Sequence, residues 1–138
     1  MIEFYSETDF QLSKQDEIRR WIENVIADRK FSLGELCYNF LDDEGLLKIN
    51  LEYLNHDTYT DIISFDYTMG NEIHGEIFIS IDRVLENAKE YNVSFEDELH
   101  RVMIHGVLHY CGLRDKTTEE ESEMRNAENN ALLQRDFV

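Results

Sequence analysis

The sequence predicts one α+β domain spanning residues 1–138, in which a mixed sheet of about four strands packs against helices. Two observations predict this class. A strand and a helix pattern come first, a run of strand patterns follows, and a run of helix patterns ends the chain, which is typical of an α+β layer fold. Leu, Ile, Phe and Val supply 40 of the 138 residues, enough apolar side chain for a highly charged chain to bury one sizeable core.

The first predicted elements are a strand and a helix. Ile2 to Tyr5 is a short apolar and aromatic stretch, typical of an edge strand. Ser13, followed three residues later by Asp16, predicts the capped N-terminus of a helix. Apolar residues then recur at helical spacing from Ile18 to Ile26, so we expect the helix to follow this cap.

A β-hairpin is expected next. Leu36 to Leu41 consists of strand-forming residues, and Asp42 to Gly45 has the composition of a turn. From Leu47 to Tyr53 apolar and polar residues alternate, which predicts a returning strand with one face in solvent. After a polar loop at 55–60, two further strands are expected at Ile62–Phe65 and Glu76–Ile81.

Three helices are predicted to complete the chain. Val84 to Ala88 indicates a short helix. Ser94 and Thr117 are each followed three residues later by an acidic residue, so they predict the caps of two longer helices, one reaching Cys111 and one ending near Leu133.

The charge balance excludes a basic nucleic-acid surface at the level of the whole chain. Thirteen Lys and Arg residues face 30 Asp and Glu residues, which leaves a net charge of −17. A polyanionic substrate would therefore need a local positive centre, such as a metal ion, to overcome long-range repulsion. The two cysteines make no disulfide framework, and neither a signal peptide nor a bilayer-spanning apolar stretch is visible. We expect a cytoplasmic protein that does not enter a membrane.

The segment His105 to Asp115 contains the candidate metal-binding residues. His105 and His109 are four residues apart on the predicted helix, so both imidazoles can reach one metal ion. Gly112 can adopt the left-handed conformation that ends a helix, which would bring Asp115 to the same face. Two histidines and a carboxylate form a three-ligand, zincin-like site with an open fourth position, as in catalytic zinc centres. A second interpretation stays open, in which Gly112 only caps the helix and Asp115 only occupies a turn.

Two differences from the metzincin pattern H-E-x-x-H-x-x-G-x-x-H bear on the reaction. Gly106 stands where a protease of that class has its glutamate base, so the adjacent-base peptidase mechanism is missing. Asp115 replaces the third histidine, and a carboxylate ligand makes zinc a weaker Lewis acid. The same donor set also suits iron or manganese.

Several ordered blocks resemble a known family. The segment at 105–112 resembles the start of the signature H-G-x-L-H-x-x-G-x-D-H of the YbeY family, the bacterial endoribonucleases of ribosomal RNA maturation. Further blocks similar to the family are Leu54–Asn55, Thr60–Phe65, Gly75–Ser80, Met124 and Glu128. The resemblance covers most of the chain from about Leu47 onward.

The resemblance implies one Zn²⁺ ion held by His105, His109 and Asp115, which would be the catalytic residues. It also implies an α+β fold with a four-stranded sheet, cleavage of single-stranded RNA, maturation of the 3′ end of 16S ribosomal RNA, and ribosome quality control. A water molecule on the zinc, with a pKa near 7, is expected to attack the phosphodiester.

Substrate contacts are less well defined by the sequence. The segment between Asn55 and Thr60 lacks the arginine that the resemblance leads us to expect, so its phosphate contact cannot be carried over. Arg114 and Lys116 flank Asp115 and are candidate phosphate contacts, and His56 is a further candidate, as is His74 beside another family block. Each of these side chains also fits an ordinary solvated position.

Three classes of function remain open. The first is a metal-dependent endoribonuclease. The second is a metal-dependent hydrolase of another bond, such as a peptide bond, which Gly106 disfavours. The third is a ribosome assembly factor with a mainly structural metal, bound to the ribosome or to a ribosomal protein. The net charge of −17 favours the third class, because free RNA is repelled and a basic partner would have to deliver it.

Overall fold

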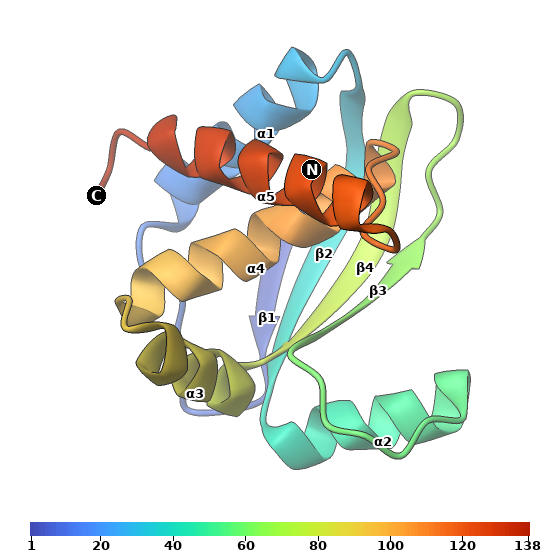
Figure 1. The fold of residues 1–138 in the computed structure, drawn as a ribbon, viewed down its shortest axis with the longest axis vertical. Helices are drawn as coiled ribbons and strands as arrows, with labels where there is room; N and C mark the ends of the chain where they lie inside the picture. The colour runs from blue at the N-terminus through green and yellow to red at the C-terminus, as the bar shows by residue number, and fades with distance from the viewer.

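A four-stranded mixed sheet with helices on both sides forms the frame of the protein. The computed structural model describes residues 1–138 (Figure 1). In chain order the elements are β1 (Ile2–Ser6), α1 (Gln15–Asp28), β2 (Ser32–Leu41), α2 (Asp43–Leu54), β3 (Ile62–Asp66), β4 (Glu72–Ser80), α3 (Ile81–Tyr91), α4 (Phe95–Tyr110) and α5 (Thr118–Leu133). The predicted fold class, a single α+β domain with a mixed sheet of four strands, is confirmed.

The strands are arranged in the order β1-β2-β4-β3. β1 and β4 run parallel to β2, whereas β3 pairs antiparallel with β4, with Ile62 opposite Ile79. β1 is an edge strand, as predicted. Side chains alternate between the two faces of a strand, so Ile73, Ile77 and Ile79 of β4 all lie buried on one face. That face is covered by α1 and α4.

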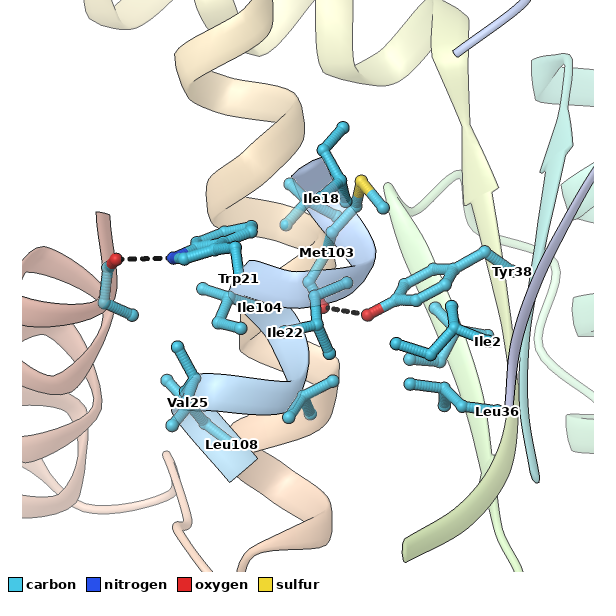
Figure 2. Packing of buried hydrophobic residues seen from close by; sticks show 14 of the residues in the cluster. Ile2, Ile18, Trp21, Ile22, Val25, Leu36, Tyr38, Met103, Ile104 and Leu108 are labelled. Atoms are coloured by element: carbon cyan, nitrogen blue, oxygen red, sulfur yellow. Dashed lines mark hydrogen bonds between the residues drawn. The ribbon is translucent and has the colours of Figure 1, made fainter. Parts of the chain in front are cut away.

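The main core lies between this face and the helices. Met103, Ile104 and Leu108 of α4 are fully buried against residues of α1 and of the sheet. Two polar groups in this core are paired with backbone carbonyls of the helices, as Figure 2 shows. The Tyr38 hydroxyl donates to the carbonyl oxygen of Met103 at 2.9 Å, and the Trp21 indole N–H donates to that of Ala131 at 2.7 Å. These bonds tie β2 to α4 and α1 to α5.

Gly106 explains how closely α4 lies on the sheet. A Cβ atom at this position would come within 2.9 Å of Ile77 Cδ1 and 3.2 Å of Ile62 Cδ1. Both distances are shorter than ordinary carbon–carbon contacts. A glutamate side chain at position 106 would have to displace this packing. Gly106 is therefore required by the close packing of α4 on the sheet, and it also leaves the site without the glutamate base of a metzincin protease.

The expected hairpin at 36–53 is wrong in its second half, because residues 43–54 form α2. The Asp42 side chain accepts a hydrogen bond from the Gly45 N–H at 2.7 Å, which caps a helix where a turn was expected. Leu46 and Asn50, one helical turn apart, are buried. Leu46 packs with Leu41 and Ile63 in a second, smaller core on the other face of the sheet. The alternation at 47–53 therefore did not decide the structure, since tertiary packing and the cap favour a helix.

The predicted cap at Ser13 is also wrong. α1 starts at Gln15, preceded by Lys14 in the left-handed conformation with no side-chain cap hydrogen bond. The other two predicted caps are confirmed. Ser94 accepts from the Asp97 N–H at 3.0 Å, and Thr117 forms a reciprocal capping box with Glu120.

The remaining predicted strands are found, with β4 starting at Glu72, before its expected first residue. The short helix expected at 84–88 is longer and spans the whole of α3. Both cysteines are free and partly buried. No helix combines the length and the apolar character needed to cross a bilayer.

Candidate metal centre

The last two turns of α4 position the two histidines. His105 and His109 are one helical turn apart, and their Nε2 atoms lie 3.0 Å from each other. Both side chains are partly exposed, by 23% and 30%, so a ligand from solvent can reach them.

Asp115 reaches the same place because the chain reverses after α4. Gly112 has a φ of +96°, in the left-handed region that favours glycine. The Leu113 N–H then donates back to the carbonyl oxygen of Leu108 at 3.1 Å, which closes the helix end. This turn places Asp115 Oδ2 at 3.5 Å from His105 Nε2 and 3.3 Å from His109 Nε2. As expected, a left-handed turn at Gly112 brings Asp115 to the same face as His105 and His109.

Hydrogen bonds on the far side of each ring determine which nitrogen faces Asp115 with a free lone pair. His109 Nδ1 lies 2.9 Å from the carbonyl oxygen of Leu113, which can only accept, so Nδ1 carries the proton. His105 Nδ1 lies 2.6 Å from Glu128 Oε2 and donates to that carboxylate. In the neutral rings both Nε2 atoms are therefore acceptors, and they converge with a carboxylate oxygen.

This donor set fits a metal ion. A tetrahedral zinc with bonds of about 2.0–2.1 Å holds neighbouring ligand atoms about 3.3 Å apart. The three distances of 3.0, 3.3 and 3.5 Å lie around that value. Three acceptors this close to one another repel unless a cation or a proton lies between them. In this structure His105, His109 and Asp115 form the one group of three such side chains close enough to share an ion.

Glu128 of α5 supports the site from behind. It is buried and also accepts from Arg101 Nη1 at 2.8 Å. Burial raises the pKa of Glu128, but the hydrogen bonds from His105 and Arg101 outweigh burial and lower it, so the carboxylate stays ionised. Burial in turn lowers the pKa of His105, but the hydrogen bond and charge of Glu128, together with the charges of Asp115 and Asp61, outweigh burial and raise it. Such a carboxylate–histidine pair fixes the ring orientation in metal sites.

A cavity of about 340 Å³ opens beside His105, and the sequence alone did not indicate it. Its walls come from α3, α4, α5 and the start of β3. Two acidic groups in it, Asp61 and Glu98, have a raised pKa because burial disfavours the charged form. Glu128 matched the family by position, but its contact with His105 and the arginines near it were missed. These residues meet only when α5 packs on α4, which no local motif encodes.

The candidate substrate contacts lie in three different places. Arg114 and Lys116 are exposed on either side of Asp115. His56 is exposed in the loop after α2, at the opposite end of the sheet from the α4–α5 connection (Figure 1). His74 lies on β4 with its side chain on the face of the sheet away from α4, where its Nε2 is 2.6 Å from Glu72 Oε1. The structure thus brings Arg114 and Lys116 close to the candidate metal ligands, and leaves His56 and His74 apart from them.

Comparison with known proteins gives one consistent result. A family model described as "Endoribonuclease YbeY" matches residues 2–135. A protein named "Endoribonuclease YbeY" from Flavobacterium johnsoniae is 54% identical, over 96% of this chain and 95% of its own. One of the same name from Bacteroides thetaiotaomicron is 48% identical, over 88% of this chain and 89% of its own.

A solved structure shares the fold. The solution structure of TM1509 from Thermotoga maritima superposes with a TM-score of 0.68 at 24% sequence identity, covering 95% of this chain and 89% of that one. The family match over nearly the whole chain supports an endoribonuclease role, the hydrolysis of phosphodiester bonds in RNA. The chain belongs to the endoribonuclease YbeY family.

Proposed function

We propose that this protein is a zinc-dependent endoribonuclease of single-stranded RNA that matures the 3′ end of 16S ribosomal RNA and takes part in ribosome quality control. The observation that carries the zinc dependence is the convergence of two imidazole lone pairs and one carboxylate, from His105, His109 and Asp115. Family membership supports the RNA substrate. Because this RNA matures in the cytoplasm of bacteria, the proposal also places the protein there, together with the ribosome or ribosomal proteins as partners.

In this proposal the protein residues hold and orient, and the ion supplies the electrophile. A bound zinc contributes Lewis-acid stabilisation of phosphoryl oxygens and lowers the pKa of water. His105 and His109 offer their Nε2 lone pairs as ligands, and Asp115 offers one oxygen. Glu128 and the Leu113 carbonyl keep the Nδ1 protons in place, so the rings do not rotate or change tautomer. With three protein ligands, a four-coordinate ion would keep one further position for water or substrate.

Substrate contacts follow from position. We assign phosphate binding to Arg114 and Lys116, because both are exposed beside Asp115 and neither side chain has a carboxylate partner. His56 lies farther away, so its contact requires an RNA strand long enough to reach the loop after α2. The backbone of Lys116 is held by Glu120, which keeps this short connection ordered at the start of α5.

The test is the metal content and the RNA cleavage of the same samples. We expect about one equivalent of zinc and cleavage of single-stranded RNA in the unmodified protein. His109→Ala and Asp115→Ala should lose both. His74→Ala is the matched control, since it removes one histidine from the opposite face of the sheet and should keep both properties. Zinc absent from the unmodified protein, or retained in both ligand variants, would show that the proposed site is wrong.

The net charge of −17 favours a second function, that of a ribosome assembly factor whose metal is structural. That function predicts zinc in the purified protein and stable binding to a basic ribosomal protein, without metal-dependent turnover of RNA. The same samples separate the two proposals, because only the first predicts that the two ligand substitutions remove an existing cleavage activity.

A further inference from the structure

The cavity beside His105 has the features of a subsite for one nucleotide. It holds about 340 Å³ and opens between α3, α4 and α5. The candidate metal ligand His105 and its partner Glu128 both form part of its wall, whereas His109 and Asp115 do not, so a group in the cavity lies beside one ligand of the candidate metal centre. The polar and aromatic side chains that line it include Asn87, Tyr91, Glu98, Arg101 and Arg125.

The two arginines of this cavity differ in how many of their N–H donors are already hydrogen-bonded. Arg101 is largely buried, and its two terminal nitrogens donate to Glu128 Oε1 at 2.8 Å and Asn129 Oδ1 at 2.7 Å. Arg125 is 58% exposed, and its nearest carboxylate oxygen is the same Glu128 Oε1, at 3.5 Å. That oxygen already accepts a closer bond from Arg101. The Arg125 guanidinium therefore keeps its planar pair of N–H donors available, which is the arrangement that binds phosphate.

Tyr91 gives the cavity an aromatic surface. It ends α3, it is 55% exposed, and it lines the same cavity as Arg125. Proteins commonly bind single-stranded RNA with exposed aromatic rings, on which every base can stack, in a groove that also carries cationic side chains. Three carboxylates, Asp61, Glu98 and Glu128, also line the cavity, and Glu128 is already paired with Arg101.

We propose that this cavity binds the nucleotide adjacent to the scissile phosphate, with Arg125 pairing with its phosphate and Tyr91 stacking on its base. The inference rests on the proposed RNA substrate and adds a defined strand position to it. Arg125 would supply, from α5, the phosphate contact that is missing from the segment between Asn55 and Thr60.

Binding of a short single-stranded RNA to the protein as purified, measured before any cleavage product accumulates, tests the proposal separately from turnover. Arg125→Gln is compared with Arg20→Gln, which makes the same change in net charge at an exposed position on α1. We expect Arg125→Gln to bind about tenfold more weakly than the control. Its plot of log K against log salt should be shallower by about 0.7, the value of one phosphate contact on a single strand.

Three further measurements make the assignment specific. Arg125→Lys should restore the salt slope but only part of the affinity, because lysine keeps the charge and loses the planar fork. Tyr91→Ala should weaken binding about tenfold, whereas Tyr91→Phe keeps the ring and should bind like the unmodified protein. Zinc content should stay the same in all four variants.

Three outcomes would overturn the proposal, each in a different way. If the unmodified protein binds and cleaves RNA while Arg125→Gln matches Arg20→Gln in affinity and slope, the subsite is wrong and the proposed function stands. If the unmodified protein neither binds nor cleaves single-stranded RNA, both fail. Loss of zinc in Arg125→Gln would also contradict the assignment, because the effect would then act through Glu128 and His105.

Discussion

Two regions of the molecule place histidine beside carboxylates, and they differ in which ring nitrogens are free. At the end of α4, His105 and His109 use Nδ1 to donate to Glu128 and Leu113 and leave both Nε2 atoms facing Asp115. On the opposite face of the sheet His74 lies in a larger cavity of about 430 Å³.

In the second region both ring nitrogens of the histidine already have hydrogen-bond partners. His74 Nδ1 accepts from the Glu35 backbone N–H at 3.1 Å, so Nε2 carries the proton and donates to Glu72 at 2.6 Å. No lone pair of His74 remains for a ligand. Cys37 lines the same cavity, yet no three metal-binding side chains converge there. The comparison teaches that the hydrogen bonds on the far side of a ring, more than the size of the cavity, decide whether a histidine can bind a metal.

A third histidine extends the comparison and gives the largest expected effect on stability. His100 is buried beside Trp21 and Phe137, and its Nδ1 accepts from Arg135 at 2.8 Å. Burial, followed by the charge of Arg135, lowers the pKa of His100 from 6.5 to about 4. As the pH falls, His100 is therefore protonated in the unfolded chain before it is protonated in the folded protein. The neutral His100 side chain contributes about 3 kcal/mol to the free energy of unfolding, and this contribution is present above pH 6.5 and lost between pH 6.5 and 4.

Denaturant unfolding of the metal-free protein at pH 7 and pH 4 measures this contribution. His100→Gln keeps an acceptor for Arg135 without a titrating group. The loss of unfolding free energy between the two pH values should be smaller in this variant by about 3 kcal/mol. Equal losses in both proteins would mean that His100 is not held neutral by the fold.

The next effect concerns the support of the metal site. Glu128→Gln keeps the shape of the side chain but removes the charge that orients His105. Loss of such a supporting carboxylate weakens metal binding by about 10- to 100-fold. Competition of each variant with a chromophoric zinc chelator gives the affinity. Glu72→Gln, beside His74, is the control and should leave it unchanged. An unchanged affinity in Glu128→Gln would remove the distinction between the two histidine regions.

The smallest effect comes from the start of α5. Thr117 caps this helix two residues after Asp115, and α5 carries Glu128. Thr117→Ala removes the capping box and should lower the unfolding free energy by about 1 kcal/mol. Since the fold of the site persists, zinc affinity should fall less than in Glu128→Gln. Thermal unfolding with and without zinc measures both quantities, and a loss of zinc affinity as large as that of Glu128→Gln would contradict this ranking.

The part of the site that could be predicted is local in the sequence. Helical spacing relates His105 to His109, and the left-handed turn at Gly112 returns Asp115, so eleven consecutive residues (105–115) specify three donors. Glu128 and Arg125 reach the site from α5 through the packing of two helices, which depends on the whole core. No spacing rule relates them to His105.

In the fold, too, the features set by local sequence could be predicted, and those set by long-range packing could not. Elements with clear caps and periodicity, such as α4 and α5, lie where they were predicted. α2 was mistaken for a strand because residues 47–53 alternate in polarity. Its stability comes from the Asp42 cap and from distant partners, including the carbonyl oxygen of Thr58, to which the buried Asn50 side chain donates at 2.8 Å. The alternation of polarity covers only residues 47–53, whereas the contacts of α2 also involve the loop at Thr58 and the strands β2 and β3, through Leu41 and Ile63.

The central claim is that His105, His109 and Asp115 hold one zinc ion through Nε2, Nε2 and a carboxylate oxygen. A crystal structure of the zinc-loaded protein, with anomalous scattering recorded at the zinc edge, tests it most directly. We predict one peak within about 2.0–2.2 Å of these three atoms, with Glu128 still bonded to His105 Nδ1. A peak beside His74 and Glu72, or zinc bound through Nδ1 of either ring at the end of α4, would contradict the account.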